Sequence, residues 1–407
     1  MKIFSEHDQL NAVIIHEPDI GIGYITPAVA EQLLYDDIVF LPRMIEEHYV
    51  FTQALRSVIG EQNVYEIEDL LGDVLKIPLA KSHLLSQLKS IDDLSEETME
   101  VLSNMNSKDL SQTLISGLDN EHQVRLKPLP NLVFTRDLAC VIHNHILLSK
   151  MNKEARKRES YLFQTIVQHH SIFHSFQEKI IDLLEIEDPE NYISIEGGDV
   201  MLVHPDYLLI GISERTSWEG FHAVKEQIFS RQIVKNIVAV KLPPERYCMH
   251  LDTVFTVLSN EFCVGYSALV FEKNSQLEVM KFTSSNCKPV NYNSLIELML
   301  EVYPEMKFIP CGNNLPPFDA REQWTDGANL VAVRPNVAFS YERNVHTLNA
   351  FRSHGFSIVD ARHFVNYSEE EQTILLKQPC IITIPSAELS RARGGTHCMT
   401  LPIGRMG

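Results

Sequence analysis

Short apolar runs recur along this 407-residue chain, and they constrain its fold more than any other feature. Each run is four to six residues long, is rich in Val and Ile, and is bounded by Gly, Pro, Asp or Asn, which is typical of buried strands. The runs are AVIIH (12–16), DVMLV (199–203), YLLIGI (207–212), VFTVLS (254–259), LVAV (330–333) and CIITI (380–384). Helical patterns lie between them, for example over residues 41–59 and 343–355. The chain is therefore predicted to be an α/β protein.

One segment departs from this alternation. Between about residues 78 and 118 there are almost no β-branched runs, and apolar residues repeat at the spacing of a helix face. These residues are Leu84, Leu88, Ile91, Leu110 and Leu114. Ser107 is placed to cap the helix that contains the last two. The simplest interpretation is a helical insertion in an α/β body.

Composition excludes several classes of partner. The net charge of −19 argues against nucleic acid and anionic membranes, because both favour clustered Lys and Arg. The seven cysteines are scattered and form no C-x-x-C motif, which indicates reduced thiols in a cytoplasm and argues against a structural zinc site. We find no secretory signal at the N-terminus and no apolar run long enough to cross a bilayer. We therefore expect a cytoplasmic protein without a membrane partner.

The segment RARGGTHCMTLPIGR (391–405) places Cys398 among glycines and basic residues. A buried structural cysteine needs no such setting, whereas a nucleophilic cysteine does, because nearby positive charge lowers the pKa of the thiol. Glycines let the backbone approach a substrate closely. The segment is either an ordinary loop or the site of a reactive thiol.

Three further motifs carry groups that could work with such a thiol. MHLDTVFTVL (249–258) contains His250 and Asp252, which would face one pocket together if the segment were a strand; the alternative is a solvated pair. Histidine is the usual proton carrier near neutral pH and a known partner of nucleophilic cysteine. Glu196, in IEGGDVML (195–202), either points into a site or belongs to a turn.

Asp137 ends the third motif, NLVFTRD (131–137), and its place after Leu-Val-Phe predicts the end of a buried strand. The polar run REQWTDGANL (321–330) also precedes a strand. No third ligand stands at a recognisable spacing from His250 and Asp252, which argues against a metal site. A cysteine, a histidine and several carboxylates suit a cationic electrophile such as a guanidinium, whose N–H donors pair with carboxylates.

The motifs together resemble a known family. NLVFTRD, EGGDV, HLDTVFT, REQWTDG followed by NVAFSYERNVHTLNAF, and RARGGTHCM occur in the order found in arginine deiminases, members of the guanidine-modifying (pentein) superfamily. The resemblance begins at SEHDQLNAVIIHEP (5–18) and covers essentially the whole chain. It implies a five-bladed α/β propeller of ββαβ modules around a pseudo-fivefold axis, with an inserted helical bundle. We expect the catalytic domain over residues 1–69 and 126–407, and the bundle over residues 70–125.

The resemblance also implies roles for the residues that match the family's motifs. Cys398 would attack the guanidinium carbon of free L-arginine, and His250 would be the general acid and base. Asp137 and Asp252 would hold the guanidinium nitrogens, while Glu196 would support the substrate nitrogen and His250. The α-carboxylate would be bound by an asparagine and three arginines, which are Asn131, Arg156, Arg215 and Arg393.

The implied reaction is hydrolysis of L-arginine to L-citrulline and ammonia through an amidino intermediate on Cys398, with no cofactor and no metal. The expected assembly is a homo-oligomer. The alternatives are an arginine dihydrolase, which would continue to ornithine and a second ammonia, an amidinotransferase, and a non-catalytic arginine-binding protein. The order of motifs through REQWTDG and the helical insertion favour the deiminase, and the intact cysteine and histidine argue against a binding protein.

His397 departs from the family pattern. Bacterial arginine deiminases commonly read Gly-Gly-Pro-Arg-Cys, whereas this chain reads Gly-Gly-Thr-His-Cys over residues 394–398. In the family this position helps to tune and gate the site, so His397 could be a second acid–base group or a packing residue. Glu6 matches a family position at the gate of the active site.

Overall fold

The computed structural model describes residues 1–186, 192–272 and 276–406, and its strands form five sheets. In order across each sheet, the strands are β18 (Leu401–Met406), β1 (Gln9–Ile15) and β2 (Val64–Glu66); β3 (Ala139–Ile142), β4 (His145–Leu148) and β5 (Ile180–Ile181); β12 (Asn286–Tyr292), β11 (Glu278–Thr283), β8 (Asn236–Lys241), β7 (Tyr207–Ile212) and β6 (Val200–His204); β13 (Lys307–Pro310), β10 (Phe262–Gly265) and β9 (Phe255–Val257); β14 (Val331–Arg334), β15 (Val337–Tyr341), β17 (Cys380–Ile384) and β16 (Ser357–Asp360). Each of the six apolar runs forms a strand, as predicted: β1, β6, β7, β9, β14 and β17.

Helices connect and cover these sheets. The described part of the chain contains α1 (Leu41–Ile59), α2 (Ile67–Val74), α3 (Pro78–Ile91), α4 (Glu96–Asn104), α5 (Ser107–Ser116), α6 (Lys157–His169), α7 (Trp218–Ser230), α8 (Ser267–Val270), α9 (Leu295–Val302), α10 (Phe318–Trp324), α11 (Val345–Ser353), α12 (Ala361–Phe364) and α13 (Glu369–Leu375). The helical patterns predicted over 41–59 and 343–355 correspond to α1 and α11. None of the helices in these described ranges has the length and apolar character needed to span a bilayer.

Every sheet contains the same local plan. Two strands pair antiparallel, and the second of them also pairs in parallel with a strand that follows a helical crossover. A parallel neighbour requires such a crossover, because a tight turn can only reverse the chain. The plan is β3–β4–α6–β5 in one module and β6–β7–α7–β8 in the next, and it recurs with β9, β10 and β13 and with β14, β15 and β17. These are the ββαβ modules that the resemblance implies.

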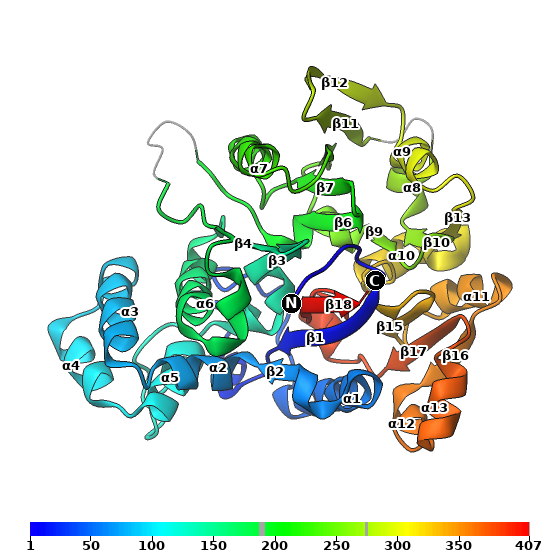
Figure 1. Ribbon diagram of the computed structural model, residues 1–407. Coiled ribbons are helices and arrows are strands. Elements are labelled where there is room, and N and C mark those ends of the chain that lie inside the picture. The colour runs from blue at the N-terminus through cyan, green and yellow to red at the C-terminus, as the bar shows by residue number, and fades with distance from the viewer. Residues whose placement is uncertain (187–191, 273–275, 407) are drawn as a thin grey trace.

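The fifth module is assembled from both ends of the chain. β18 pairs antiparallel with β1, and the chain continues through α1 to β2, the parallel partner of β1. Figure 1 shows β1 and β18 side by side near the centre of the molecule, with the other sheets arranged around them. The Arg405 guanidinium donates to the Asp8 carbonyl at 2.6 Å, across 397 residues of sequence. The pairing closes the ring of five modules.

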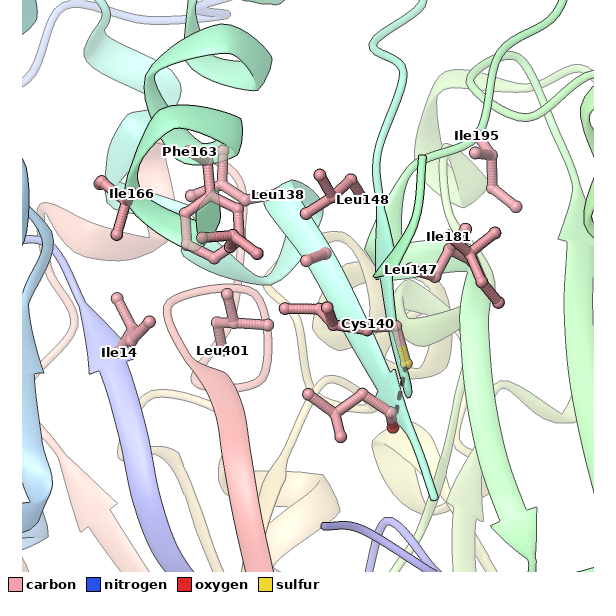
Figure 2. Packing of buried hydrophobic residues seen from close by; sticks show 14 of the residues in the cluster. Ile14, Leu138, Cys140, Leu147, Leu148, Phe163, Ile166, Ile181, Ile195 and Leu401 are labelled. Carbon is pink, nitrogen blue, oxygen red and sulfur yellow. Dashed lines mark hydrogen bonds between the residues drawn. The ribbon is translucent and has the colours of Figure 1, made fainter. Parts of the chain in front are cut away.

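The helical segment expected to be an insertion shares its core with the body. Leu84 and Leu110 belong to the same buried apolar cluster as Ile14 of β1 and Phe163 of α6. Figure 2 shows the part of this cluster in which Ile14 and Leu401 face Leu138 and Phe163. The helices from α2 to α5 thus pack directly on α6 and the sheets, and the division into two domains at residues 70 and 125 stays a prediction.

The predicted cap of α5 is wrong by one residue. Asn106, not Ser107, is the N-cap, and its side chain accepts the backbone N–H of Asp109 at 3.0 Å. Ser107 is the first helical residue. Asn and Ser cap helices about equally well, so two adjacent capping residues leave the position of the boundary open in the sequence.

Candidate active site

Seven of the nine residues predicted for the site line one pocket. The pocket holds about 480 Å³ of empty space, including the part that is open to solvent. The seven residues are Asn131, Asp137, Arg156, Arg215, His250, Arg393 and Cys398. The other two lie directly behind them, because Glu196 binds His250 and Asp252 contacts Cys398. The structure therefore brings all nine side chains together.

The catalytic candidates occupy the same point of their modules, just before the first strand. Asp137 and Glu196 belong to short 3-10 turns or their caps, which lead into β3 and β6, and His250 precedes the turn before β9. Cys398 lies in the segment that leads into β18. Since the modules share one plan, these positions meet at the pocket.

The sequence prediction is wrong about the local structure of two of these segments. The apolar residues before Asp137 predict the end of a strand, but Asp137 lies in a 3-10 turn (Thr135–Leu138) that precedes β3. His250 is extended, whereas Asp252 lies in the 3-10 turn Leu251–Thr253. A 3-10 turn has about three residues per turn, so the two-residue alternation of a strand does not place these side chains. Their side chains reach the site by the turn instead.

His250 lies between two carboxylates. Its Nε2 is 2.9 Å from Oε2 of Glu196, and its Nδ1 is 3.6 Å from Oδ1 of Asp137. Burial alone would lower the pKa of His250, but these carboxylates raise it to about 10. The ring is therefore an imidazolium at neutral pH, with a proton to donate.

Gly198 allows this cluster to be compact. A Cβ at Gly198 would lie 2.8 Å from Oδ1 of Asp137 and 2.9 Å from Cγ of His250, closer than side chains pack. Ligand atoms of Asp137, Glu196 and His250 lie within 4.8 Å of one another, a separation that a metal ion could bridge. A histidine binds metal through an unprotonated nitrogen, however, and two flanking carboxylates favour the imidazolium. The cluster is thus better suited to proton transfer than to metal binding.

Cys398 is a buried thiol next to carboxylates. Its Sγ lies 3.6 Å from Oδ2 of Asp252 and accepts a hydrogen bond from the Asn329 amide at 3.2 Å. Burial, together with the charges of Asp252 and Asp137, raises the pKa of the thiol well above its usual value. The expectation that neighbouring basic residues lower this pKa is therefore wrong, because Arg391 pairs with Asp37 instead.

Two buried carboxylate oxygens face the pocket region without a hydrogen bond. Oδ1 of Asp137 and Oδ1 of Asp252 accept none from the residues that the structure describes. An unsatisfied buried acceptor is costly, and an ionised one more so. These oxygens are therefore well prepared for a ligand with several N–H donors.

Arg156 and Asn131 are strongly bound to the protein itself. The Arg156 guanidinium donates to Asp137, to Glu159 at 2.8 and 2.9 Å, and to the Asn131 carbonyl at 3.1 Å. The Asn131 amide donates to the Leu33 carbonyl at 2.7 Å. Arg156 thus fixes Asp137 in place, and a carboxylate ligand would share its guanidinium with these partners.

Arg393 has more unused hydrogen-bonding capacity. Its Nε and Nη1 are buried and donate to no residue in the described ranges, and its guanidinium carbon lies 3.4 Å from the centre of the Trp324 ring. Arg215 is intermediate, since its Nε donates to Glu214 at 3.0 Å and its Nη1 is 3.7 Å from Glu196. Arg393 is therefore the best-placed cation for an anionic group of a ligand.

His397 links two buried carboxylates. Its Nδ1 is 2.8 Å from Oδ2 of Asp252, and its Nε2 is 3.3 Å from Oε2 of Glu6. Glu6 also accepts from Arg136 at 2.7 Å, so it lies inside this chain of contacts rather than among the pocket-lining residues of the described chain. Burial opposes the effect, but the hydrogen bond from His397 holds the pKa of Asp252 below its usual value. The geometry favours a supporting role for His397.

Three residues at the pocket are missing from the sequence prediction. Asp326 and Arg246 line it, and Asn329 contacts the Cys398 sulfur. Asp326 and Asn329 lie in REQWTDGANL, just before β14, which is the first strand of the remaining module. The position that supplies the other catalytic candidates would therefore have identified them. Arg246, which donates to the Leu34 carbonyl at 3.4 Å, carries no such signal.

The chain was compared with known families, proteins and structures. The family model described as arginine deiminase matches residues 80–405. An arginine deiminase of Listeria monocytogenes serotype 4a (strain HCC23) is 30% identical over 430 residues, covering 100% of this chain and 98% of the relative. One of Bacillus cereus (strain ATCC 10987 / NRS 248) is 29% identical over 440 residues, with the same coverage.

Solved structures support the fold. An amidinotransferase of saxitoxin biosynthesis from Microseira wollei has a TM-score of 0.55 at 14% identity, covering 100% of this chain and 97% of its own. The product-bound N-terminal domain of a cyanobacterial arginine dihydrolase has a TM-score of 0.54 at 14% identity, covering 98% of both chains. Together with the five modules, this likeness confirms the expected pentein-type α/β fold.

Proposed function

The chain belongs to the arginine deiminase family, and from that premise we propose that its pocket hydrolyses free L-arginine to L-citrulline and ammonia. The observation that carries this proposal is a buried thiol, Cys398, beside the unsatisfied Oδ1 atoms of Asp137 and Asp252. A planar guanidinium has N–H donors for both oxygens, and its positive charge balances both carboxylates. The enzyme is thus a hydrolase of amidine C–N bonds.

The charges of the pocket explain how a buried thiol becomes a nucleophile. Burial and the carboxylates of Asp252 and Asp137 keep Cys398 protonated, since they raise its pKa. Arginine brings a positive charge next to these carboxylates, which offsets their effect and favours the thiolate. The thiolate then adds to the guanidinium carbon, while the carboxylates hold the nitrogen atoms of the tetrahedral adduct.

His250 serves both halves of the reaction. As an imidazolium it donates its proton to the leaving nitrogen, ammonia departs, and an amidino group remains on the Cys398 sulfur. The neutral imidazole then takes a proton from water, whose oxygen bonds to the amidino carbon. When the C–S bond breaks, citrulline leaves and the thiolate is restored. Glu196, 2.9 Å from Nε2, holds the ring through both steps.

Product stoichiometry with free L-arginine tests the function directly. We expect one citrulline and one ammonia per arginine, measured by chromatography and an ammonia assay. Agmatine, which has the guanidinium but no carboxylate, should react at least about 100-fold more slowly, because it forfeits charge-assisted hydrogen bonds to Arg393 and Arg215.

Other products would contradict this assignment. Ornithine with two ammonia would indicate a dihydrolase, and transfer to an added amine would indicate an amidinotransferase. Binding of arginine without turnover would indicate a binding protein. Equal rates with agmatine and arginine would refute the role of the arginines while leaving the deiminase chemistry intact.

Two substitutions at His397 separate support of Asp252 from proton transfer. We expect His397→Ala to lower kcat/KM for arginine about 10- to 100-fold, because Asp252 loses a hydrogen bond to a charged donor. In His397→Asn the amide nitrogen can take the place of Nδ1, so most of the activity should return. Steady-state kinetics of both variants would decide, and equal losses in both would instead favour an acid–base role.

We propose, finally, that the enzyme is a cytoplasmic homo-oligomer. The exposed apolar side chains Phe40, Ile45 and Tyr49 along α1 and its start support an interface between copies. The six cysteines whose side chains are described are free thiols, as expected in a reducing compartment. Light scattering on the purified protein tests the assembly, since a monomer would have a mass of 46.5 kDa.

A further inference from the structure

Asn329 holds the backbone on either side of the bond between His397 and Cys398. Its side chain is buried between α10 and β14, and Oδ1 accepts the backbone N–H groups of His397 and Cys398, both at 3.1 Å. Gly395 makes room for this contact, because a Cβ there would lie 2.5 Å from Oδ1 of Asn329. The nucleophile is thus anchored by a residue from a different module.

These contacts fix the orientation of the amide. Two backbone N–H donors on one side require the oxygen there, and the Asp252 carbonyl on the other side requires the nitrogen, which donates to it at 3.0 Å. The same Nδ2 lies 3.2 Å from Sγ of Cys398. An amide nitrogen has two N–H bonds, so one can serve the carbonyl and the other the sulfur.

The charges around the sulfur give this second N–H a purpose. Asp252 and Asp137 disfavour a negative sulfur, and a thiolate in a buried site needs hydrogen-bond donors to be stable. We propose that Asn329 is a further catalytic residue, whose amide N–H donates to the Cys398 thiolate and stabilises it for attack on the guanidinium carbon. The inference rests on the proposed function for its substrate, but the state of the sulfur can be measured without substrate.

Alkylation of Cys398 by iodoacetamide measures the thiolate directly. The rate is followed at pH 8, with peptide mass spectrometry to separate Cys398 from the other cysteines. In Asn329→Ala we expect the rate to fall about 10- to 100-fold, because a hydrogen bond to a charged group is lost and the thiol pKa rises by about one to two units. The value of kcat/KM for arginine should fall by a similar factor.

Asn329→Asp separates thiolate stabilisation from anchoring. A carboxylate keeps an oxygen for the N–H groups of His397 and Cys398 but has no N–H for the sulfur. We expect slow alkylation in this variant as well. An alkylation rate equal to that of the wild type, with only a change in thermal stability, would overturn the proposal and leave Asn329 a structural residue.

Asn344→Ala is the matched control. Asn344 is also fully buried, and its amide donates to the Thr325 carbonyl at 2.9 Å, away from the pocket. This variant should lose stability but keep the alkylation rate of Cys398; a loss as large as in Asn329→Ala would contradict a specific role for Asn329. If Asn329→Ala fails to fold, Asn329→Asp decides. Absence of arginine turnover by the wild type would refute the proposed function, not the contact with the thiolate.

Discussion

Replacement of Cys398 by alanine is expected to lower the turnover of arginine by about 10⁵-fold or more, the order expected when the nucleophile of a covalent mechanism is lost. Alanine removes the atom that adds to the guanidinium carbon, and no other described thiol lines the pocket. Asp137 and Asp252 keep their free oxygens, so arginine should still bind. Citrulline assays measure the first effect and calorimetry the second.

Cys380→Ala is a suitable control for this variant. Cys380 is a fully buried thiol in β17, within the apolar core and not among the pocket residues. Its replacement should cost some stability, because it leaves a small cavity, but should leave turnover near that of the wild type. Substantial citrulline formation by Cys398→Ala, well above the uncatalysed rate, would refute covalent catalysis by this cysteine.

Replacement of His250 by asparagine is expected to lower kcat by about 10³- to 10⁴-fold, the upper range for loss of general acid–base catalysis. Asparagine retains a hydrogen-bonding group near Glu196 but cannot carry a proton to the leaving nitrogen. The loss should be in kcat more than in KM, because Asp137 and Asp252 still bind the guanidinium.

The pH dependence gives a second test of His250. Its pKa is raised to about 10, so the imidazolium is present below this pH and is lost as the pH rises through it. The wild-type kcat should therefore fall above about pH 10, while the residual activity of His250→Asn should lack this decrease. His48 is the control, since this buried histidine has a pKa lowered to about 3 and lies outside the pocket lining. A decrease of the same shape in His250→Asn would exclude His250 as its source.

The strands and the first helix could be predicted because their signal is local. An apolar run such as CIITI becomes β17 wherever it is buried, and the pattern over residues 41–59 gives α1 with the same bounds. The five modules could not be recognised as repeats, because they share a path of the chain and not a set of residues. The resemblance to a family supplied that step.

The site was predictable in its residue types but not in its geometry. His250 and Asp252 do meet the same cysteine, yet through a 3-10 turn, which leaves no periodic signal in so short a segment. The raised pKa of Cys398 depends on Asp137 and Asp252, which are far from it in sequence. Asn329 was overlooked because an asparagine next to a strand is usually part of a turn, and only the assembled structure shows what its amide contacts.

The pairing of β1 with β18 has a consequence for how the enzyme matures. Cys398 lies just before β18, and its carbonyl accepts the backbone N–H of Arg136 at 3.0 Å, so contacts between very distant parts of the sequence place it. Such contacts close large loops and tend to form late in folding. A partly folded chain can already hold its carboxylates and His250 in compact inner modules while the nucleophile is still outside. Folding intermediates are therefore chemically silent, and the reactive thiol is assembled only when the ring closes.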